Sequence, residues 1–234
     1  MRLTLIGTGN LGTNLHAALR EAGHEVTWLH GRSFEAQDVE GDLVIIAVKD
    51  DAITAVASRL AETDKLVAHT SGSIPMTAIP CRRRGVFYPM QTFSRERIVE
   101  FRPIPIFLES DTDLPLLQQL AASISNEVYQ LNSEKRRLLH LAAVFACNFA
   151  NHCYALSAEV LKEAGLPFEV MLPLIDETAR KVHTMSPQSA QTGPAVRYDE
   201  GVISRHEQML DGTTRDIYHL MSKSIHDKLR PKED

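Results

Sequence analysis

Residues 2–12, RLTLIGTGNLG, decide the fold of this chain. An apolar, β-rich run, Arg2–Ile6, leads directly into the pattern G-x-G-x-x-G at residues 7–12. Apolar residues at helical spacing follow across Asn10–Ala22, and Gly23 ends that run. A strand, a glycine turn and a helix in this order are typical of a dinucleotide-binding βαβ unit. The alternative is a glycine turn that binds no ligand.

The alternation of strand and helix continues to about residue 130. Expected strands lie at Glu25–Leu29, Asp42–Val48, Leu66–His69, Gly85–Tyr88 and Ile104–Leu108, and expected helices follow Asp51 and cover Asp113–Ile124. Continuous apolar runs such as DLVIIAV are typical of strands that are covered on both faces. The pattern therefore predicts an α/β fold with a doubly wound parallel sheet and right-handed crossovers.

The second part of the chain lacks a convincing strand. Helices are expected over Glu134–Ala164, Phe168–His183, Val202–Leu210 and Thr213–Leu229, with an irregular loop at Met185–Glu200. This change of pattern predicts two domains. The first, 1–131, is a Rossmann domain with a parallel sheet, and the second, 132–234, is an all-α domain.

Composition excludes several classes of protein. The 234 residues are 44% hydrophobic and 24% charged, as in ordinary globular proteins. The net charge of −5 gives no basic excess for nucleic acid, and no apolar run is long enough for a membrane span. The first residues lack the pattern of a signal peptide, so none is expected. Three cysteines without a CxxC motif indicate reduced thiols in a cytoplasmic protein, and scattered histidines give no support for a metal site.

The glycine pattern has a specific physical meaning at each glycine. Gly7 permits a tight turn, Gly9 lets the backbone approach a pyrophosphate, and Gly12 lets the helix pack closely on the sheet. Free N–H groups at the start of the helix attract phosphates. We therefore predict that the cofactor contacts the whole loop: Gly7, Thr8, Gly9, Asn10, Leu11 and Gly12.

The end of the second strand indicates which dinucleotide binds. Proteins that bind NAD usually carry a carboxylate there, which accepts from the ribose 2′-hydroxyl. This chain has His30-Gly31-Arg32-Ser33 instead. The planar fork of Arg32 can pair with a 2′-phosphate, and Ser33 can donate to the same group. The segment, including His30, therefore predicts NADP as the cofactor. The alternative for Arg32 is an exposed loop arginine.

The next two strands end in residues that should also face the cofactor. Ligands of open α/β sheets bind at the carboxyl ends of the strands. We therefore expect Val48 and Lys49 beside a cofactor ribose, and His69 and Ser71 near the nicotinamide. The alternative for His69 is a structural histidine that is bonded to the loop backbone.

One segment of the helical half, Leu138–Ala150, is apolar almost all round. A helix of this kind is buried on every side, which in a small protein favours a homodimer packed through the helical half. His140 and Asn148 interrupt the apolar run and share one broad face, so they are candidates to line a cleft. Buried polar groups need partners, and the alternative partner for each is the protein backbone.

The loop at residues 185–200 is a second candidate binding segment. Long irregular loops in compact domains are more often functional than not. We expect Thr192 and Arg197, with Asp199, to bind an anionic substrate group and to hold the loop in place. The alternative is a helix connector whose charged side chains pair with each other or with water.

These segments together resemble a known superfamily. GTGNLG (7–12), HGRS (30–33) and AVKDDAI (47–53) are similar to the N-terminal domain of the 6-phosphogluconate-dehydrogenase-like proteins, which include pyrroline-5-carboxylate reductase, ketopantoate reductase and the F420-dependent NADP oxidoreductases. HTSGS (69–73), YPMQTF (88–93), HLAAVFACNF (140–149) and TGPAVRYD (192–199) resemble a narrower family, in which a Rossmann-like domain precedes a DUF2520 domain. Tyr88 and Tyr198 stand where that family pattern has His and Gly.

The resemblance implies an activity and a place for the chemistry. In the related reductases the substrate binds between the Rossmann domain and the first long helix that follows it. This implies that His140 is the proton donor, because an imidazole titrates near neutral pH, and that Asn148 and Gln91 contact a small-molecule substrate. The implied function is an NADP(H)-dependent oxidoreductase that reduces a C=O or C=N compound. The alternative is a non-catalytic NADP-binding dimer that senses redox state. A polar cleft containing His140 would favour the enzyme.

Overall fold

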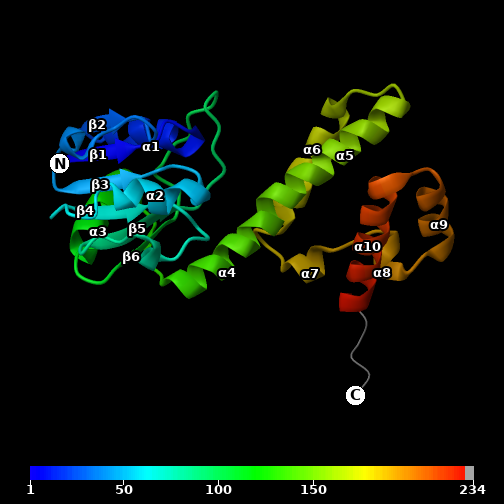
Figure 1. Ribbon diagram of the computed structural model, residues 1–234. Helices are drawn as coiled ribbons and strands as arrows, with labels where there is room; N and C mark the ends of the chain where they lie inside the picture. The colour runs from blue at the N-terminus through cyan, green and yellow to red at the C-terminus, as the bar shows by residue number, and fades with distance from the viewer. Residues whose placement is uncertain (230–234) are drawn as a thin grey trace, which may run out of the picture. The chain divides into compact units, whose positions relative to one another are not determined.

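The computed structural model describes residues 1–229. The chain forms two compact units, of which the first is Met1–Phe149 and the second begins at Ala150 (Figure 1). The helices-only part of the sequence begins at Ser133, but its first helix lies within Met1–Phe149. That helix therefore belongs to the first unit. Within the described residues, no helix is both long and apolar enough to cross a membrane.

The first unit is built on one seven-stranded sheet with the order β2-β1-β3-β4-β5-β6-β7. Figure 1 shows the strands from β2 to β6 following one another in this order. Their bounds are β1 Arg2–Ile6, β2 Glu25–Leu29, β3 Leu43–Ile46, β4 Leu66–His69, β5 Arg84–Pro89, β6 Ile106–Ser110 and β7 Val128–Gln130. Six of these seven strands overlap the expected ones. The three-residue β7 was not expected, because so short a run carries no periodic signal.

The predicted doubly wound, mainly parallel sheet is confirmed, with one antiparallel pair near its edge. Strands β1 to β5 pair in parallel, whereas β6 pairs antiparallel with β5 and parallel with β7. A parallel partner for β5 would need a crossover, usually through a helix. The described segment 90–105 between β5 and β6 contains no helix, so the chain returns antiparallel.

Helices cover both faces of the sheet, as a doubly wound fold requires. Helices α1 (Asn10–Glu21) and α3 (Leu114–Ile124) bury apolar side chains on one face, against alternate residues of β1 and β3. Helix α2 (Ile53–Ser58) packs on the opposite face, against the other set of strand residues. Short 3₁₀ turns η1 (Ala36–Asp38), η2 (Asp50–Ala52) and η3 (Met76–Ala78) complete the connections.

The long helix expected after residue 133 changes its geometry midway. Helix α4 (Ser133–Ala143) begins where the Asn132 side chain accepts from the Lys135 N–H at 3.0 Å. A π-helical segment, η4 (Val144–Phe149), follows, and α5 (Ala150–Glu163) continues it. Each residue of a π turn advances less around the axis than in an α-helix. The later residues of η4 are therefore rotated from the positions that a regular helix predicts.

The described part of the second unit, residues 150–229, is helical. After α5 come η5 (Phe168–Met171), α6 (Leu172–Lys181), α7 (Pro187–Ala190), α8 (Pro194–Arg197), α9 (Glu200–Gln208) and α10 (Gly212–Leu229). The prediction of an irregular loop at residues 185–200 is wrong, because α7 and α8 lie within it. Each of these short helices starts with a proline, which is preorganised for the first helical position and lacks the N–H that would go unpaired there.

Candidate functional site

The glycine turn after β1 lies where the strand order reverses, which is the usual ligand site of an open α/β sheet. Gly7 has a φ of +124°, and a Cβ there would lie 2.1 Å from the Ala47 carbonyl oxygen. A Cβ on Gly12 would lie 2.2 Å from the Gly7 carbonyl oxygen. The turn and the close packing of α1 on the sheet therefore both require glycine. Gly9, by contrast, faces open space.

This turn forms one wall of a cavity of about 850 Å³, the first cavity. It is lined by Gly7, Thr8, Gly9, Asn10, Leu11, His30, Gly31, Arg32, Ala47, Val48, Lys49, Asp51, Ala52, Val56, Thr70 and Arg95. Most of the predicted cofactor residues therefore lie around one space. Gly12, Ser33, His69 and Ser71 are not among the lining residues, and Ser33 is exposed on the turn after β2.

The prediction that His69 and Ser71 face the cofactor does not fit their contacts. His69 is fully buried; its Nδ1 accepts from the Ser71 N–H at 3.1 Å, and its Nε2 donates to the Pro75 carbonyl at 3.4 Å. Burial, with the nearby Arg136 charge, lowers the pKa of His69 to about 4. The Ser71 hydroxyl accepts from the Ser73 and Ile74 N–H groups. Both side chains are occupied in holding the turn after β4.

Sequence reasoning missed two residues that hydrogen-bond to the glycine turn. Arg95 lines the first cavity and donates to the Thr8 carbonyl at 2.7 Å, which brings a cation onto the glycine turn. Trp28 donates from Nε1 to the Gly7 carbonyl at 2.8 Å and stacks on His16. Trp28 is the only tryptophan of the chain, so its fluorescence reports on this turn. Neither contact has a local sequence signal, because each joins distant segments.

A second cavity of about 580 Å³ lies at the carboxyl end of β5, at the same edge of the sheet as the glycine turn. It is lined by Tyr88, Met90, Gln91, Thr92, Phe93, Leu139, His140, Ala142, Ala143, Ala146, Cys147 and Asn148. The structure thus brings three predicted substrate or catalytic residues, Gln91, His140 and Asn148, around one space. The π-helical turns of η4 rotate Asn148 toward the face that carries His140.

His140 is held by groups that the sequence did not predict. The Tyr88 hydroxyl lies 3.0 Å from His140 Nδ1. Burial raises the pKa of Tyr88, so this group stays a hydroxyl that can donate to a neutral imidazole or accept from a charged one. A Cβ on Gly72 would lie 2.6 Å from His140 Nδ1, so only glycine leaves room for the ring. The imidazole is therefore fixed between the turn after β4 and the end of β5.

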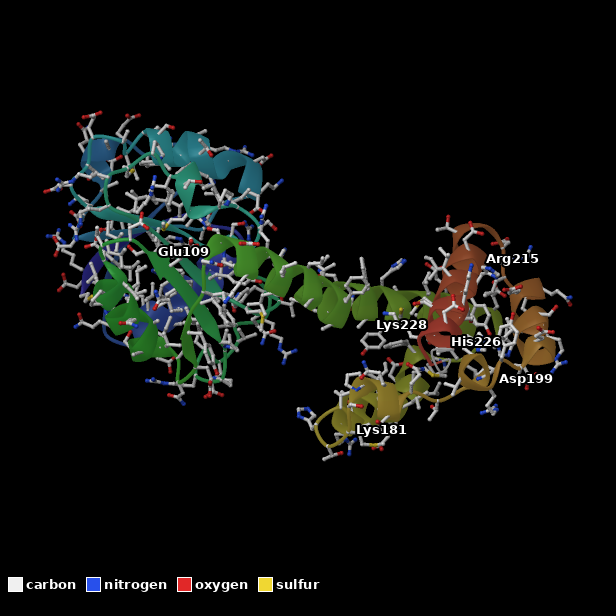
Figure 2. All side chains as sticks on the ribbon, turned by 90° about the horizontal axis from the view of Figure 1, so that it is seen from below. Glu109, Lys181, Asp199, Arg215, His226 and Lys228 are labelled. Atoms are coloured by element: carbon white, nitrogen blue, oxygen red, sulfur yellow. The ribbon has the colours of Figure 1, made fainter. Side chains whose placement is uncertain are left out.

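A buried arginine joins α4 to the sheet. Arg136 is fully buried and forms an ion pair with Glu109 of β6, which lies on the sheet (Figure 2). Its other N–H groups donate to the Ser71 carbonyl at 3.1 Å, the Ile74 carbonyl at 2.6 Å and the Ser133 hydroxyl at 3.2 Å. The network fixes the helix that carries His140 against the turn after β4. Within the run EKRR, Arg136 is indistinguishable from solvated neighbours, so sequence reasoning missed it.

The remaining predicted residues belong to the second unit, whereas both cavities are built from the first. Thr192 and Arg197 are exposed, and the Asp199 carboxylate accepts from the Val202 N–H at 3.1 Å and caps α9. Tyr198 has a φ of +51° and stacks on His226 at a ring distance of 4.0 Å. The position where the family pattern has glycine thus adopts a left-handed conformation.

The sheet order and the glycine turn define a Rossmann-like α/β protein with a helical C-terminal region. Comparison with known proteins places it more narrowly. Residues 104–225 match the model of the domain of unknown function DUF2520. The chain is 45% identical to a solved "putative NADP oxidoreductase" from Bacteroides fragilis, with a TM-score of 0.88 and coverage of 97% of this chain and 98% of that one. The chain belongs to the DUF2520 family.

More distant structures share the fold. A protein from Thermotoga maritima is 22% identical, with a TM-score of 0.72 and 98% of each chain covered. An imine reductase from Myxococcus stipitatus, solved in complex with NADP⁺, is 14% identical, with a TM-score of 0.67 and coverage of 98% of this chain and 93% of that one. No curated protein matches the sequence at a significant level.

Proposed function

We propose that this protein is an NADP(H)-dependent oxidoreductase that reduces a small C=O or C=N compound. The observation that carries the proposal is the second cavity, where a hydrogen-bonded Tyr88–His140 pair lies at the sheet edge that also carries the glycine turn. The similarity to the Bacteroides fragilis NADP oxidoreductase and to the imine reductase that binds NADP⁺ supports it. A redox sensor without catalysis does not need a cavity with these polar groups.

The first cavity has the chemistry that NADP requires. Open space at Gly9 leaves room for a pyrophosphate at the N-terminus of α1. Arg32 lines the cavity near the end of β2, and the segment 30–33 has no carboxylate to repel a 2′-phosphate. Val48 and Lys49 line it beside the turn after β3. Bound NADPH would supply a hydride, and the residues of the second cavity would supply the rest of the chemistry.

His140 is the proposed proton donor. To donate a proton the ring must be the imidazolium, with Nδ1–H donating to the Tyr88 hydroxyl and Nε2–H available to the reacting heteroatom. After the proton is given up, Tyr88 donates to the neutral ring, so the hydrogen bond persists in both states. Gln91 and Asn148 offer amide groups that orient the substrate.

We expect NADP(H) to bind more tightly than NAD(H). A charge-assisted pair between Arg32 and the 2′-phosphate contributes about 1.5–3 kcal/mol, or roughly ten- to hundred-fold in affinity. Calorimetric titration of the wild type and Arg32→Ala measures this difference. The variant should lose affinity for NADPH and keep its affinity for NADH, because only NADPH carries the 2′-phosphate. Equal affinities of the wild type for the two cofactors would contradict the assignment.

We also propose that two copies pair through the helical half. Leu138, Leu141, Phe145 and Phe149 form an apolar stripe on α4 and η4, and each side chain is half-exposed or more within one chain. The sequence predicted that this helix is buried on every side. Because the stripe is exposed within one chain, a second copy would have to cover it. Light scattering at micromolar concentration should give twice the 26.1 kDa of one chain, and a mass of 26.1 kDa would contradict pairing.

A further inference from the structure

We infer that the second cavity takes a neutral carbonyl compound, a ketone or an aldehyde, that carries no carboxylate, phosphate or amine. This inference rests on the proposed function and narrows it, because the sequence left C=O and C=N substrates open. It also differs from the sequence-based expectation that Arg197 binds an anionic substrate group. Three features of the cavity support this inference. They are the residues of its lining, the partners that already occupy the nearest buried charges, and the hydrogen-bond donors that face a ligand.

Apart from His140, the described lining of the second cavity offers no charged side chain. Among the residues that the structure describes, those lining the second cavity include no Asp, Glu, Lys or Arg. Half of the wall is apolar, formed by Met90, Phe93, Leu139, Ala142, Ala143 and Ala146. A carboxylate, phosphate or ammonium group that leaves water for such a surface loses its hydration and finds no Asp, Glu, Lys or Arg as a counter-ion, and the proton of His140 is committed to the reacting oxygen. The lining therefore favours a ligand without net charge.

The nearest buried cation has no capacity left for an anionic ligand. Arg136 lies four residues before His140, but its guanidinium pairs with Glu109 and donates to two carbonyls and a hydroxyl. Glu109 is in turn occupied, because it accepts from Ser133 N–H and Ser133 Oγ–H as well as from Arg136. Neither charge of this pair is available to a carboxylate or an ammonium group in the cavity.

The polar groups that remain suit an oxygen acceptor. His140, Tyr88, Asn148 and Gln91 can all donate hydrogen bonds, and a carbonyl oxygen accepts them in both the ground state and the developing alkoxide. An imine is most reactive when it is protonated, and the resulting iminium cation needs a carboxylate beside it. The described lining supplies none. The cavity therefore favours C=O over C=N.

The reduction balances if bound NADPH supplies the hydride and His140 supplies the proton. A hydride brings two electrons to the carbonyl carbon and forms a C–H bond, while the π pair of the C=O bond moves to the oxygen. That oxygen takes the proton of the His140 imidazolium and becomes a hydroxyl, which leaves the ring neutral until solvent protonates it again. The product is an alcohol, and the positive charge lost by the imidazolium is balanced by the one that NADPH gains on becoming NADP⁺.

Three probes built on one phenyl ring test the inference by calorimetry on the full-length protein saturated with NADP⁺. They are acetophenone, which is neutral, phenylglyoxylate, which is anionic, and 1-phenylethylamine, which is cationic. Acetophenone should bind at least about tenfold more tightly than either charged probe, because burying an unpaired charge is costly. Ala146→Leu, which adds bulk to an exposed position of the cavity wall, should weaken acetophenone binding about tenfold.

The matched control is Ala155→Leu, the same change at an exposed position of α5 outside this cavity, which should leave acetophenone binding unchanged. Tighter binding of phenylglyoxylate, above all if Arg197→Ala removes it, would overturn the inference, as would tighter binding of the amine or no binding of acetophenone. NADP⁺ affinity is measured first in each protein. Failure to bind NADP⁺ would refute the proposed function. Normal NADP⁺ binding, with a charged probe bound more tightly than acetophenone, would refute only the substrate class.

Discussion

His140→Ala should lower the rate of carbonyl reduction by about 10²–10⁴-fold, the usual contribution of a positioned acid. The physical reason is the loss of the imidazole that lines the second cavity and that the Tyr88 hydroxyl holds at 3.0 Å. His140→Asn should lose the same activity, because an amide fills part of the space and bonds to Tyr88 but transfers no proton. Steady-state kinetics with NADPH and acetophenone measure the effect.

Two controls separate proton transfer from packing. His152→Ala removes an exposed histidine of α5 and should leave turnover within about twofold of the wild type, since exposed substitutions rarely disturb a fold. NADPH affinity should be the same in all three variants, because His140 is not among the residues lining the first cavity. Wild-type turnover in both His140 variants would contradict the catalytic role and would leave His140 as a structural histidine.

Arg136→Met should lower the free energy of unfolding by about 3–5 kcal/mol, the cost of leaving one partner of a buried ion pair uncompensated. The change strands the Glu109 carboxylate and leaves the Ser71 and Ile74 carbonyls without their donor. Denaturant unfolding followed by Trp28 fluorescence measures it, since that residue belongs to the same unit. The neighbouring Arg137→Met serves as the matched control, because Arg137 is exposed and its loss should change stability by less than about 0.5 kcal/mol.

The double variant Arg136→Met with Glu109→Gln distinguishes a stranded charge from a simple loss of packing. Once the carboxylate is replaced by a neutral amide, most of the lost stability should return, because well-packed uncharged groups often replace a buried pair at little cost. A double variant as unstable as Arg136→Met alone would contradict this account. So would an Arg136→Met protein that is as stable as the Arg137→Met control.

The glycine turn could be predicted residue by residue because its requirements are local. Gly7 and Gly12 are set by backbone atoms of the turn and the adjoining strand, and a strand followed by a helix supplies that context in the sequence. Arg32 could be placed for the same reason, since the end of β2 follows from the βαβ unit. The direction of β6 could not be predicted, because an apolar run does not encode whether a strand runs parallel or antiparallel to its neighbour.

The second cavity could be predicted only in part. His140 and Asn148 stand out as polar residues in an apolar helix, so the sequence identified them as candidates. Their surroundings depend on contacts between distant segments: Tyr88 lies 52 residues from His140, and Arg136 lies 65 residues from Ser71. A charge run such as EKRR gives no sign of which arginine is buried. Periodicity indicates which residues face inward but not which partner they meet.

Titration of the wild-type protein with NADPH, followed by Trp28 fluorescence, shows whether the glycine turn binds this cofactor. Trp28 is the only tryptophan and donates to the Gly7 carbonyl, so a nicotinamide cofactor in the first cavity should quench its emission. We expect saturable quenching by NADPH, with NADH binding roughly ten- to hundred-fold more weakly. Trp28 emission that shows no saturable change with NADPH would contradict binding of this cofactor at the glycine turn.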